Sequence, residues 1–298
     1  KSYWRKANDG SITYASIHEK NKYDLGHSVP EDVYSKWEKM SKSKGNIIDP
    51  IEIIDQFGSD AMRIALCSSV TNARQIDIDR RKFEEYKNFA NKLWNASRFI
   101  FMNLDKKDDL KELTTEDIKN GLNRDLFTLE DKWILSLLNQ LVENVNKHLQ
   151  EYNFDKLASS IYKFFWDEFC AYYLEFSKPY LFGKAGDENI RTNKQKILLI
   201  VLLSSIRLLH PITPFITEEI FSLLKIRFDG VSKNDLADPY TKDVIEALLS
   251  KYCIVSPFPK LFSKDDVLPK IQDEFSFIEE IIKTCRNIKA EMKIPPSL

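Results

Sequence analysis

The sequence predicts a mainly α protein, an antiparallel helical bundle preceded by a small α+β segment. Only 8 of the 298 residues are glycine, few for an α/β fold that needs a tight turn at each strand–helix junction. Long segments repeat apolar residues at three- and four-residue steps, which is typical of amphipathic helices. Residues 197–203 form an unbroken apolar run inside one such segment, as expected for the central rod of a bundle.

Composition narrows the classes of function. The net charge is −1, so any contact with nucleic acid has to come from a local patch and not from the whole molecule. The longest apolar run has seven residues, against the roughly 20 needed to span a bilayer. We therefore expect a cytoplasmic protein with no membrane partner.

The four cysteines lie far apart in the sequence, with no C-x-x-C pair and no neighbouring histidine cluster. This pattern predicts buried small hydrophobes in a reducing compartment, with neither a disulfide framework nor a metal site. They are Cys67, Cys170, Cys253 and Cys285.

The first 38 residues give two expectations. Asp9-Gly10, flanked by aromatic and β-branched residues, predicts the turn of a β-hairpin over residues 3–14. The polar residues 18–38 predict an irregular surface segment, in which His18 and His27 are solvated and are not metal ligands.

A lysine-rich loop follows. Lys39, Lys42 and Lys44 are separated by Met40-Ser41 and by Ser43, and Gly45-Asn46 follows them. Serine disfavours helix interiors and unpaired ammonium groups cannot be buried, so this segment predicts an exposed loop. Compact positive charge on a loop suits a polyphosphate ligand, although a merely solvated turn is the alternative.

A helix start lies immediately downstream. Asp49 is the expected N-cap, Pro50 fits the first helical position, and Glu52 is expected to close a capping box. Gly58 ends this helix and Ser59 begins the next. A rigid helix beside the loop would provide the fixed hinge that a closing active-site loop requires.

Residues 79–104 predict one long amphipathic helix, whose polar face carries several lysines and arginines. Between Thr71 and Lys107, nine Lys and Arg stand against five Asp and Glu. This excess predicts a phosphate-contacting face, with an ordinary solvated surface as an equal alternative.

The remainder predicts the bundle. Residues 162–176 are rich in aromatics on nearly every face, which favours core packing over base stacking. Glu218 and Glu219 are expected in the first turn of their helix, where acids suit the helix dipole. We expect a linker over 105–125, helices over 128–149, 154–176, 190–209, 213–225, 243–249 and 275–292, and a strand over 252–255.

Several segments then resemble a known family, the class I aminoacyl-tRNA synthetases of the branched-chain subgroup. They are KMSKSKGNIIDP (39–50), FGSDAMR (57–63) and LLHPITPFITEEI (208–220). Residues 86–99 and 286–297 resemble the valyl-tRNA synthetases within that subgroup, whereas residues 1–38 align weakly and suggest a lineage-specific version of the strands before the loop.

The resemblance implies three parts: a C-terminal edge of the catalytic domain over 1–60, stem-contact helices and linker over 61–125, and an anticodon-binding bundle over 126–298. It further implies ATP-dependent activation of valine and its transfer to tRNA(Val), with Mg-ATP as substrate, no metal bound by this chain, and a monomer.

The resemblance also implies site residues. Lys42 would contact ATP with Lys39 assisting, and Met40, Ser41 and Ser43 would complete the ATP loop. For contacts with tRNA, it implies the residues on the long helix, which are Asn91, Lys92 and Arg98.

The sequence contains no H-I-G-H-like segment and no alternation of strands and helices before the lysine loop. In the family these features, and the editing domain, lie upstream. The resemblance therefore implies a C-terminal part of a longer protein, inactive alone. The alternatives are a fragment of an isoleucyl- or leucyl-tRNA synthetase, a stand-alone tRNA-binding module, and a helical scaffold without an RNA partner.

Overall fold

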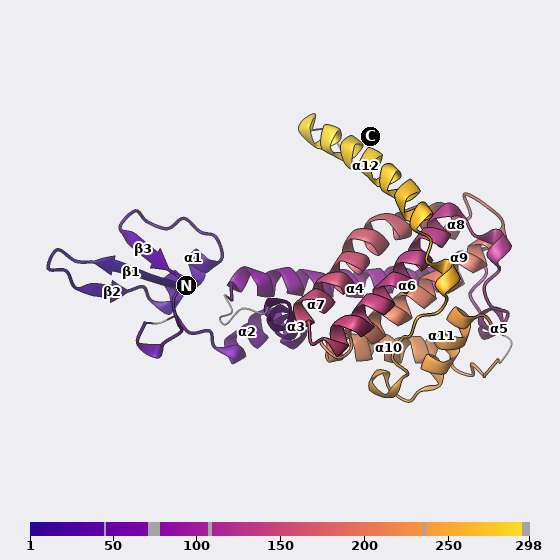
Figure 1. The fold of residues 1–298 in the computed structure, drawn as a ribbon, viewed down its shortest axis with the longest axis horizontal. Coiled ribbons are helices and arrows are strands. Elements are labelled where there is room, and N and C mark those ends of the chain that lie inside the picture. Colours follow the sequence, from indigo (N-terminus) through magenta and orange to yellow (C-terminus); the bar gives the residue numbers. More distant parts are fainter. Residues whose placement is uncertain (45, 71–77, 107–108, 235–236, 294–298) are drawn as a thin grey trace.

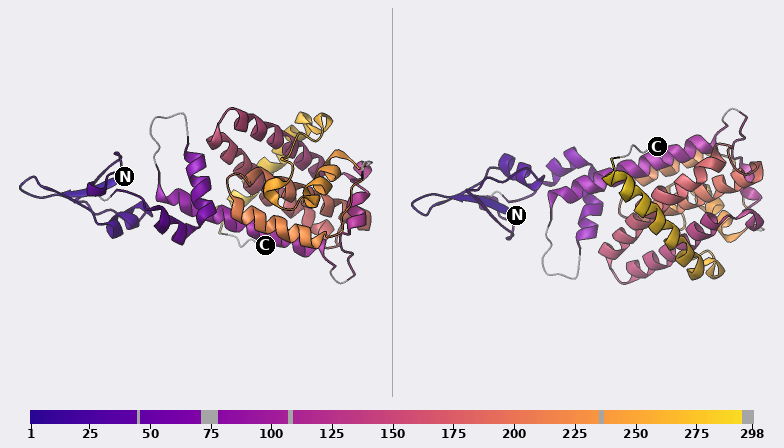
Figure 2. Two further views of the ribbon diagram at one scale, coloured as in Figure 1. Left: turned by 90° about the horizontal axis from the view of Figure 1, so that it is seen from below. Right: turned by 90° about the horizontal axis from the view of Figure 1, so that it is seen from above.

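The computed structural model describes residues 1–44, 46–70, 78–106, 109–234 and 237–293. Figure 1 shows a small sheet at one end of an elongated molecule and a large group of packed helices at the other, and Figure 2 shows the same division in two further views. The mainly α prediction is confirmed.

The small sheet has three antiparallel strands, β1 (Ser2–Lys6), β2 (Ile12–Tyr14) and β3 (Val33–Lys36), in the order β2-β1-β3. The predicted hairpin is confirmed as β1 and β2, and Gly10 supplies the positive φ of +83° that its turn requires. Tyr3, Ala15 and Val33 form a small hydrophobic cluster of their own.

The prediction of an irregular segment over 18–38 is wrong, because this stretch contains helix α1 (Ile17–Asp24) and strand β3. Ser16 and Glu19 form a capping box that starts α1. Strand β3 forms because it pairs with β1 across a long sequence separation, which local polarity does not reveal. His18 and His27 are exposed, as expected.

Three helices connect the sheet to the bundle: α2 (Pro50–Phe57), α3 (Ser59–Ser69) and α4 (Arg80–Leu104). The N-cap of α4 is Asp79. The apolar residues that recur along it at three- and four-residue steps are all buried: Phe83, Tyr86, Phe89, Leu93, Ala96, Ile100 and Leu104. Helices α3 and α4 contribute to the same hydrophobic cluster as the bundle, so this core is continuous from α2 onward.

The bundle surrounds α9 (Glu188–Leu209), whose predicted apolar run over 197–203 is buried throughout. The aromatic segment over 162–176 packs mostly into the core, as expected, through a π-helical stretch over Lys163–Tyr173. The other elements are α5 (Thr115–Lys119), α6 (Leu129–Gln150), α7 (Phe154–Tyr162), α8 (Leu174–Leu181), α10 (Pro214–Arg227), α11 (Pro239–Leu249) and α12 (Pro269–Glu291).

Two local predictions in the bundle are wrong. The expected strand over 252–255 is a 3₁₀ turn, η4 (Cys253–Val255), which packs against α10 with Ile254 and Val255 exposed. Its β-branched residues have no neighbouring strand to pair with among the described residues. Glu218 and Glu219 both lie beyond the first turn of α10, because the helix begins at Pro214.

The last helix, α12, projects away from the bundle in Figure 1 and buries only Phe275 fully. Cys285 on this helix is exposed, contrary to the prediction that all four cysteines are buried, whereas Cys170 and Cys253 are buried and Cys67 is partly so. Among the described residues, no helix combines the length and the apolar character that a membrane crossing needs.

Candidate nucleotide loop and RNA-facing helix

The lysine loop follows β3 and contains a 3₁₀ turn, η1 (Lys42–Lys44). A buried amide fixes its shape. Asn46, 1% exposed, accepts a hydrogen bond from the Ser41 amide at 2.7 Å and donates to the Lys39 carbonyl at 3.2 Å and to Ser2 Oγ at 2.8 Å. The loop is therefore closed on itself and attached to the first strand of the sheet.

The three lysines of this loop differ in their surroundings. Lys39 and Lys42 are exposed, and the described part of the chain holds no ion pair to either. Lys44 is ion-paired with Glu38, which lowers the pKa of the Glu38 carboxyl and raises that of the Lys44 ammonium. Two ammonium groups are thus left for a ligand, and the third is held by the protein.

Of the other predicted loop residues, Met40 is exposed and Ser41 is half-buried. The side chain of Ser43 lies outside the part that the structure describes, as does Gly45.

Of the two N-terminal capping contacts predicted for α2, only the one from Asp49 is present. The Asp49 carboxylate accepts from the Ile51 amide at 2.9 Å, but Glu52 does not close a capping box. Its carboxylate instead accepts from Asn21 of α1 at 3.1 Å and from Arg80 of α4 at 2.8 Å. Arg80 is 4% exposed, so this ion pair ties three helices together at the base of the loop.

The next helix, α3, joins this region to the bundle. Arg63 donates to the carbonyls of Ile212 at 2.7 Å and Pro211 at 3.1 Å, which follow the end of α9. Asp60 accepts from the Ile216 amide at 2.7 Å, at the start of α10. Two segments that the sequence analysis singled out, 57–63 and 208–220, are therefore in direct contact.

The structure places the predicted RNA-contacting residues on two sides of α4. Asn91 and Arg98 are exposed on one face, seven residues and two helical turns apart. Lys92 points to a neighbouring side, where its ammonium lies 5.5 Å from the centre of the Trp166 ring.

The face with Asn91 and Arg98 also carries apolar residues that sequence reasoning did not select. Trp94 is 40% exposed and Met102 is 58% exposed. With Ile226 of α10 they line a groove of about 370 Å³. The sequence already indicated this apolar surface, because Trp94 and Met102 occupy positions on the otherwise polar face of the helix.

Much of the predicted positive charge near α4 is engaged by the protein. Arg80 is buried in its ion pair, Arg81 pairs with Asp79, and Lys87 donates to the Gln56 carbonyl at 2.9 Å. Arg74, Asp77 and Lys107 lie outside the described residues. The charge excess counted from sequence therefore overstates the free positive charge of this helix.

Comparison with known proteins gives the family. Residues 131–298 match the model of the anticodon-binding domain of tRNA ligase. The chain belongs to this anticodon-binding family. Residues 13–79 match a second model, the class I tRNA synthetases for I, L, M and V. This match begins within residues 1–38, where the resemblance seen in the sequence is weak.

Individual relatives agree with this assignment. The chain is 55% identical to a valine–tRNA ligase of Protochlamydia amoebophila over 298 residues, which is 99% of this chain and 31% of that protein. It is 44% identical to a valine–tRNA ligase of Chlamydia caviae over 297 residues, again 99% of this chain and 31% of the relative. The resemblance to valyl-tRNA synthetases is confirmed, and the chain spans about a third of the length of these relatives.

Among solved structures, a LeuRS–tRNA–LeuAMS ternary complex from Agrobacterium radiobacter K84 matches 77% of this chain and 23% of that chain. The TM-score is 0.45 and the sequence identity 18%, too low to support a statement about this chain.

Proposed function

We propose that this chain supplies the ATP loop and the tRNA-binding helices of a valine–tRNA ligase. The single observation that carries the proposal is the 55% identity to a valine–tRNA ligase across 99% of the chain. The relatives favour valine over isoleucine and leucine, and the class I match at residues 13–79 favours a part of an enzyme over a stand-alone binding module or a scaffold.

The proposed chemistry is activation of valine by Mg-ATP followed by transfer to tRNA(Val). A carboxylate oxygen of valine forms a bond to the α-phosphorus, and the bond from that phosphorus to the bridging oxygen breaks, releasing pyrophosphate. Negative charge grows on the departing pyrophosphate. Lys42, with Lys39 assisting, would stabilise this charge more in the transition state than in the ground state.

The exposure of Lys39 and Lys42 supports this assignment, because both ammonium groups are available to a ligand whereas Lys44 is paired with Glu38. Met40, Ser41 and Ser43 would shape the loop around the nucleotide. Arrival of a phosphate group that competes with Glu38 for Lys44 would add a third charge, so we keep Lys44 as an auxiliary candidate.

A substitution in the full-length protein tests the nucleotide role. We expect Lys42→Ala to lower the rate of valine-dependent ATP–pyrophosphate exchange by about 100-fold or more, as for loss of one charge-stabilising donor. Lys22→Ala, at an exposed lysine of α1, is the matched control and should leave exchange unchanged. Normal exchange by Lys42→Ala would refute the assignment.

The proposed RNA contacts are Asn91, Lys92 and Arg98 on α4, with tRNA(Val) as the partner. We expect Arg98→Ala to weaken tRNA(Val) binding about tenfold and to reduce the slope of log affinity against log salt by about 1, if Arg98 meets a phosphate. Arg81→Ala is the control, because Arg81 is also an exposed arginine of α4 but is already paired with Asp79.

Specificity is tested by gel-shift titration of the full-length protein with the tRNAs for valine, isoleucine and leucine. The valine proposal predicts tightest binding to tRNA(Val). Equal affinity for all three tRNAs would remove the support for valine while leaving the synthetase class in place.

A further inference from the structure

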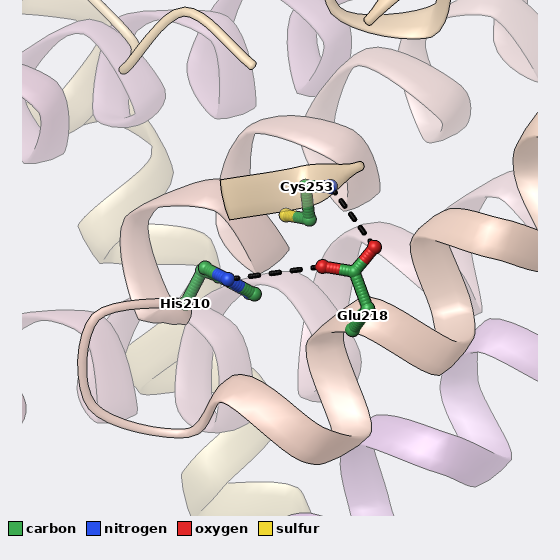
Figure 3. A group of neighbouring side chains, drawn as sticks. All are labelled: His210, Glu218 and Cys253. Atoms are coloured by element: carbon green, nitrogen blue, oxygen red, sulfur yellow. Dashed lines mark hydrogen bonds and ion pairs between the residues drawn. The ribbon is translucent and has the colours of Figure 1, made fainter. Parts of the chain in front are cut away.

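Three side chains with metal-binding atoms converge where α9 ends, α10 begins its second turn and η4 passes over both (Figure 3). They are His210, Glu218 and Cys253, and one ligand atom from each lies within 4.8 Å of the other two. The sequence does not indicate that these three residues meet, because Cys253 is 43 residues from His210 along the chain. Only the tertiary structure brings them together.

The tautomer of His210 follows from its neighbours. The Thr217 hydroxyl donates its hydrogen to the Thr213 carbonyl at 2.7 Å, so it can only accept from His210 Nδ1, which lies 2.8 Å away. Nδ1 therefore carries the proton, and Nε2 presents a lone pair. A histidine whose second ring nitrogen is held by a hydrogen bond is the usual arrangement of a metal ligand.

That lone pair faces a second acceptor. Glu218 Oε2 lies 3.8 Å from His210 Nε2, while Glu218 Oε1 is oriented by the Cys253 amide at 3.0 Å. With the proton on Nδ1, the Nε2 lone pair and the Glu218 carboxylate face one another across this gap, and both can bind a cation.

The third group is the Cys253 thiol. Cys253 is 3% exposed, and its Sγ completes the group of three ligand atoms. A bound divalent ion would displace the thiol proton, and its two charges would be offset by one thiolate and one carboxylate, which leaves a neutral site.

We propose that His210, Glu218 and Cys253 form a Zn²⁺ site in which a water completes four-coordination. Nitrogen, oxygen and sulfur ligands of this kind suit Zn²⁺, a borderline-soft ion without strong geometric preference. Tetrahedral zinc with these ligands has ligand–ligand distances of about 3.3–3.8 Å. The observed separations, up to 4.8 Å, require inward movement of about 1 Å at most, and one pair already lies at 3.8 Å.

The site would tie η4 to the turn between α9 and α10. Glu218 is 31% exposed at its side chain, which gives the ion a route from solvent and leaves a place for the water ligand. The same turn receives Arg63 of α3 at the carbonyls of Pro211 and Ile212, so the zinc would stiffen the junction between the bundle and the loop-bearing region.

Metal content of the full-length protein tests the proposal. After chelation and reloading with Zn²⁺, the wild type should hold one more equivalent than Cys253→Ser and Glu218→Gln. Cys285→Ser, at the exposed cysteine of α12, is the matched control and should hold as much zinc as the wild type. Thr217→Val should bind Zn²⁺ about 10-fold more weakly, because the histidine loses the partner that orients it.

Absorption of the Co²⁺-loaded protein provides a second measurement. Comparing variants at Cys253 separates this site from any other site that binds zinc. A thiolate-to-Co²⁺ charge-transfer band in the near ultraviolet should appear in the wild type and in Cys285→Ser, and should be missing from Cys253→Ser. If Cys253→Ser does not fold, Glu218→Gln provides the test, because it should also lack the band. Equal zinc content in the wild type and Cys253→Ser, or no band that depends on Cys253, would overturn the site.

Discussion

At the scale of single residues, the shape of the proposed nucleotide loop depends on a buried amide and not on its lysines. From a buried position, Asn46 bonds to the backbone of Lys39 and Ser41 at the start of the lysine loop and to Ser2 on β1. Buried amides are costly to remove because their partners lose hydrogen bonds that water cannot replace. Asn46 is thus a positioning residue for Lys39 and Lys42.

We expect Asn46→Ala in the full-length protein to lower kcat for ATP–pyrophosphate exchange at least tenfold, since small displacements of a catalytic group cost rate steeply. KM for valine should stay unchanged, because the loop is proposed to contact ATP and not valine. Asn88→Ala, at an exposed position of α4, is the control. A fall in valine affinity as large as the fall in kcat would indicate general damage instead.

At the scale of elements, the start of α6 is held to α9 by a buried ionic cluster. Lys194 on α9 is fully buried and lies 2.8 Å from both Glu130 and Asp131, which belong to the first turn of α6. Tyr173 also donates to Asp131, at 2.7 Å. Although burial raises the pKa of Glu130, the Lys194 charge outweighs it, so the pKa of Glu130 lies below its ordinary 4.5.

Removing this lysine should be costly, because two carboxylates would remain buried without a cation. We expect Lys194→Ala to lower the free energy of unfolding by about 3–5 kcal/mol, measured by urea denaturation. Lys178→Ala breaks an exposed pair with Glu175 on α8 and should cost less than about 1 kcal/mol. Equal losses in the two variants would contradict the cluster's role.

The same cluster predicts a change in pH dependence. In the wild type the Glu130 contribution is present above pH 4.5 and is lost as the pH falls through the lowered pKa. In Lys194→Ala the unpaired buried carboxyl has a raised pKa, so its penalty appears as the pH rises. The variant should therefore be closest to the wild type in stability under acidic conditions, as urea titrations at several pH values would show.

At the scale of the whole molecule, α3 connects the nucleotide loop to the anticodon-binding bundle. Arg63 and Asp60 on this helix bond to opposite sides of the α9–α10 turn, to backbone carbonyls and to backbone amides respectively. Because both residues bond to the backbone, they fix the position of the turn and of α10 itself and not only of its side chains.

We expect Arg63→Ala to lower the free energy of unfolding by about 1.5–3 kcal/mol, the range for hydrogen bonds to a charged group. The amide hydrogens of Ile212 and Thr213 in this turn should exchange faster, while those of α6 should be unaffected. Arg81→Ala, which removes an exposed ion pair, is the control. Unchanged exchange at this turn would show that α3 does not hold the junction.

The sequence by itself determined the elements whose signals are local. Apolar periodicity predicted α4 and α9, and turn and cap residues predicted the hairpin around Gly10 and the start of α2. The motif residues of the lysine loop were also visible, because five consecutive side chains of fixed type need no tertiary context.

Only the tertiary structure decided features that depend on distant partners. Strand β3 exists because β1 lies beside it, and residues 252–255 form no strand because the described chain places none next to them. Glu52 faces Arg80 instead of capping its own helix, and Cys253 meets His210 and Glu218. The partners of β3, Glu52 and Cys253 each lie tens of residues away along the chain, where spacing in the sequence carries no information about distance in space.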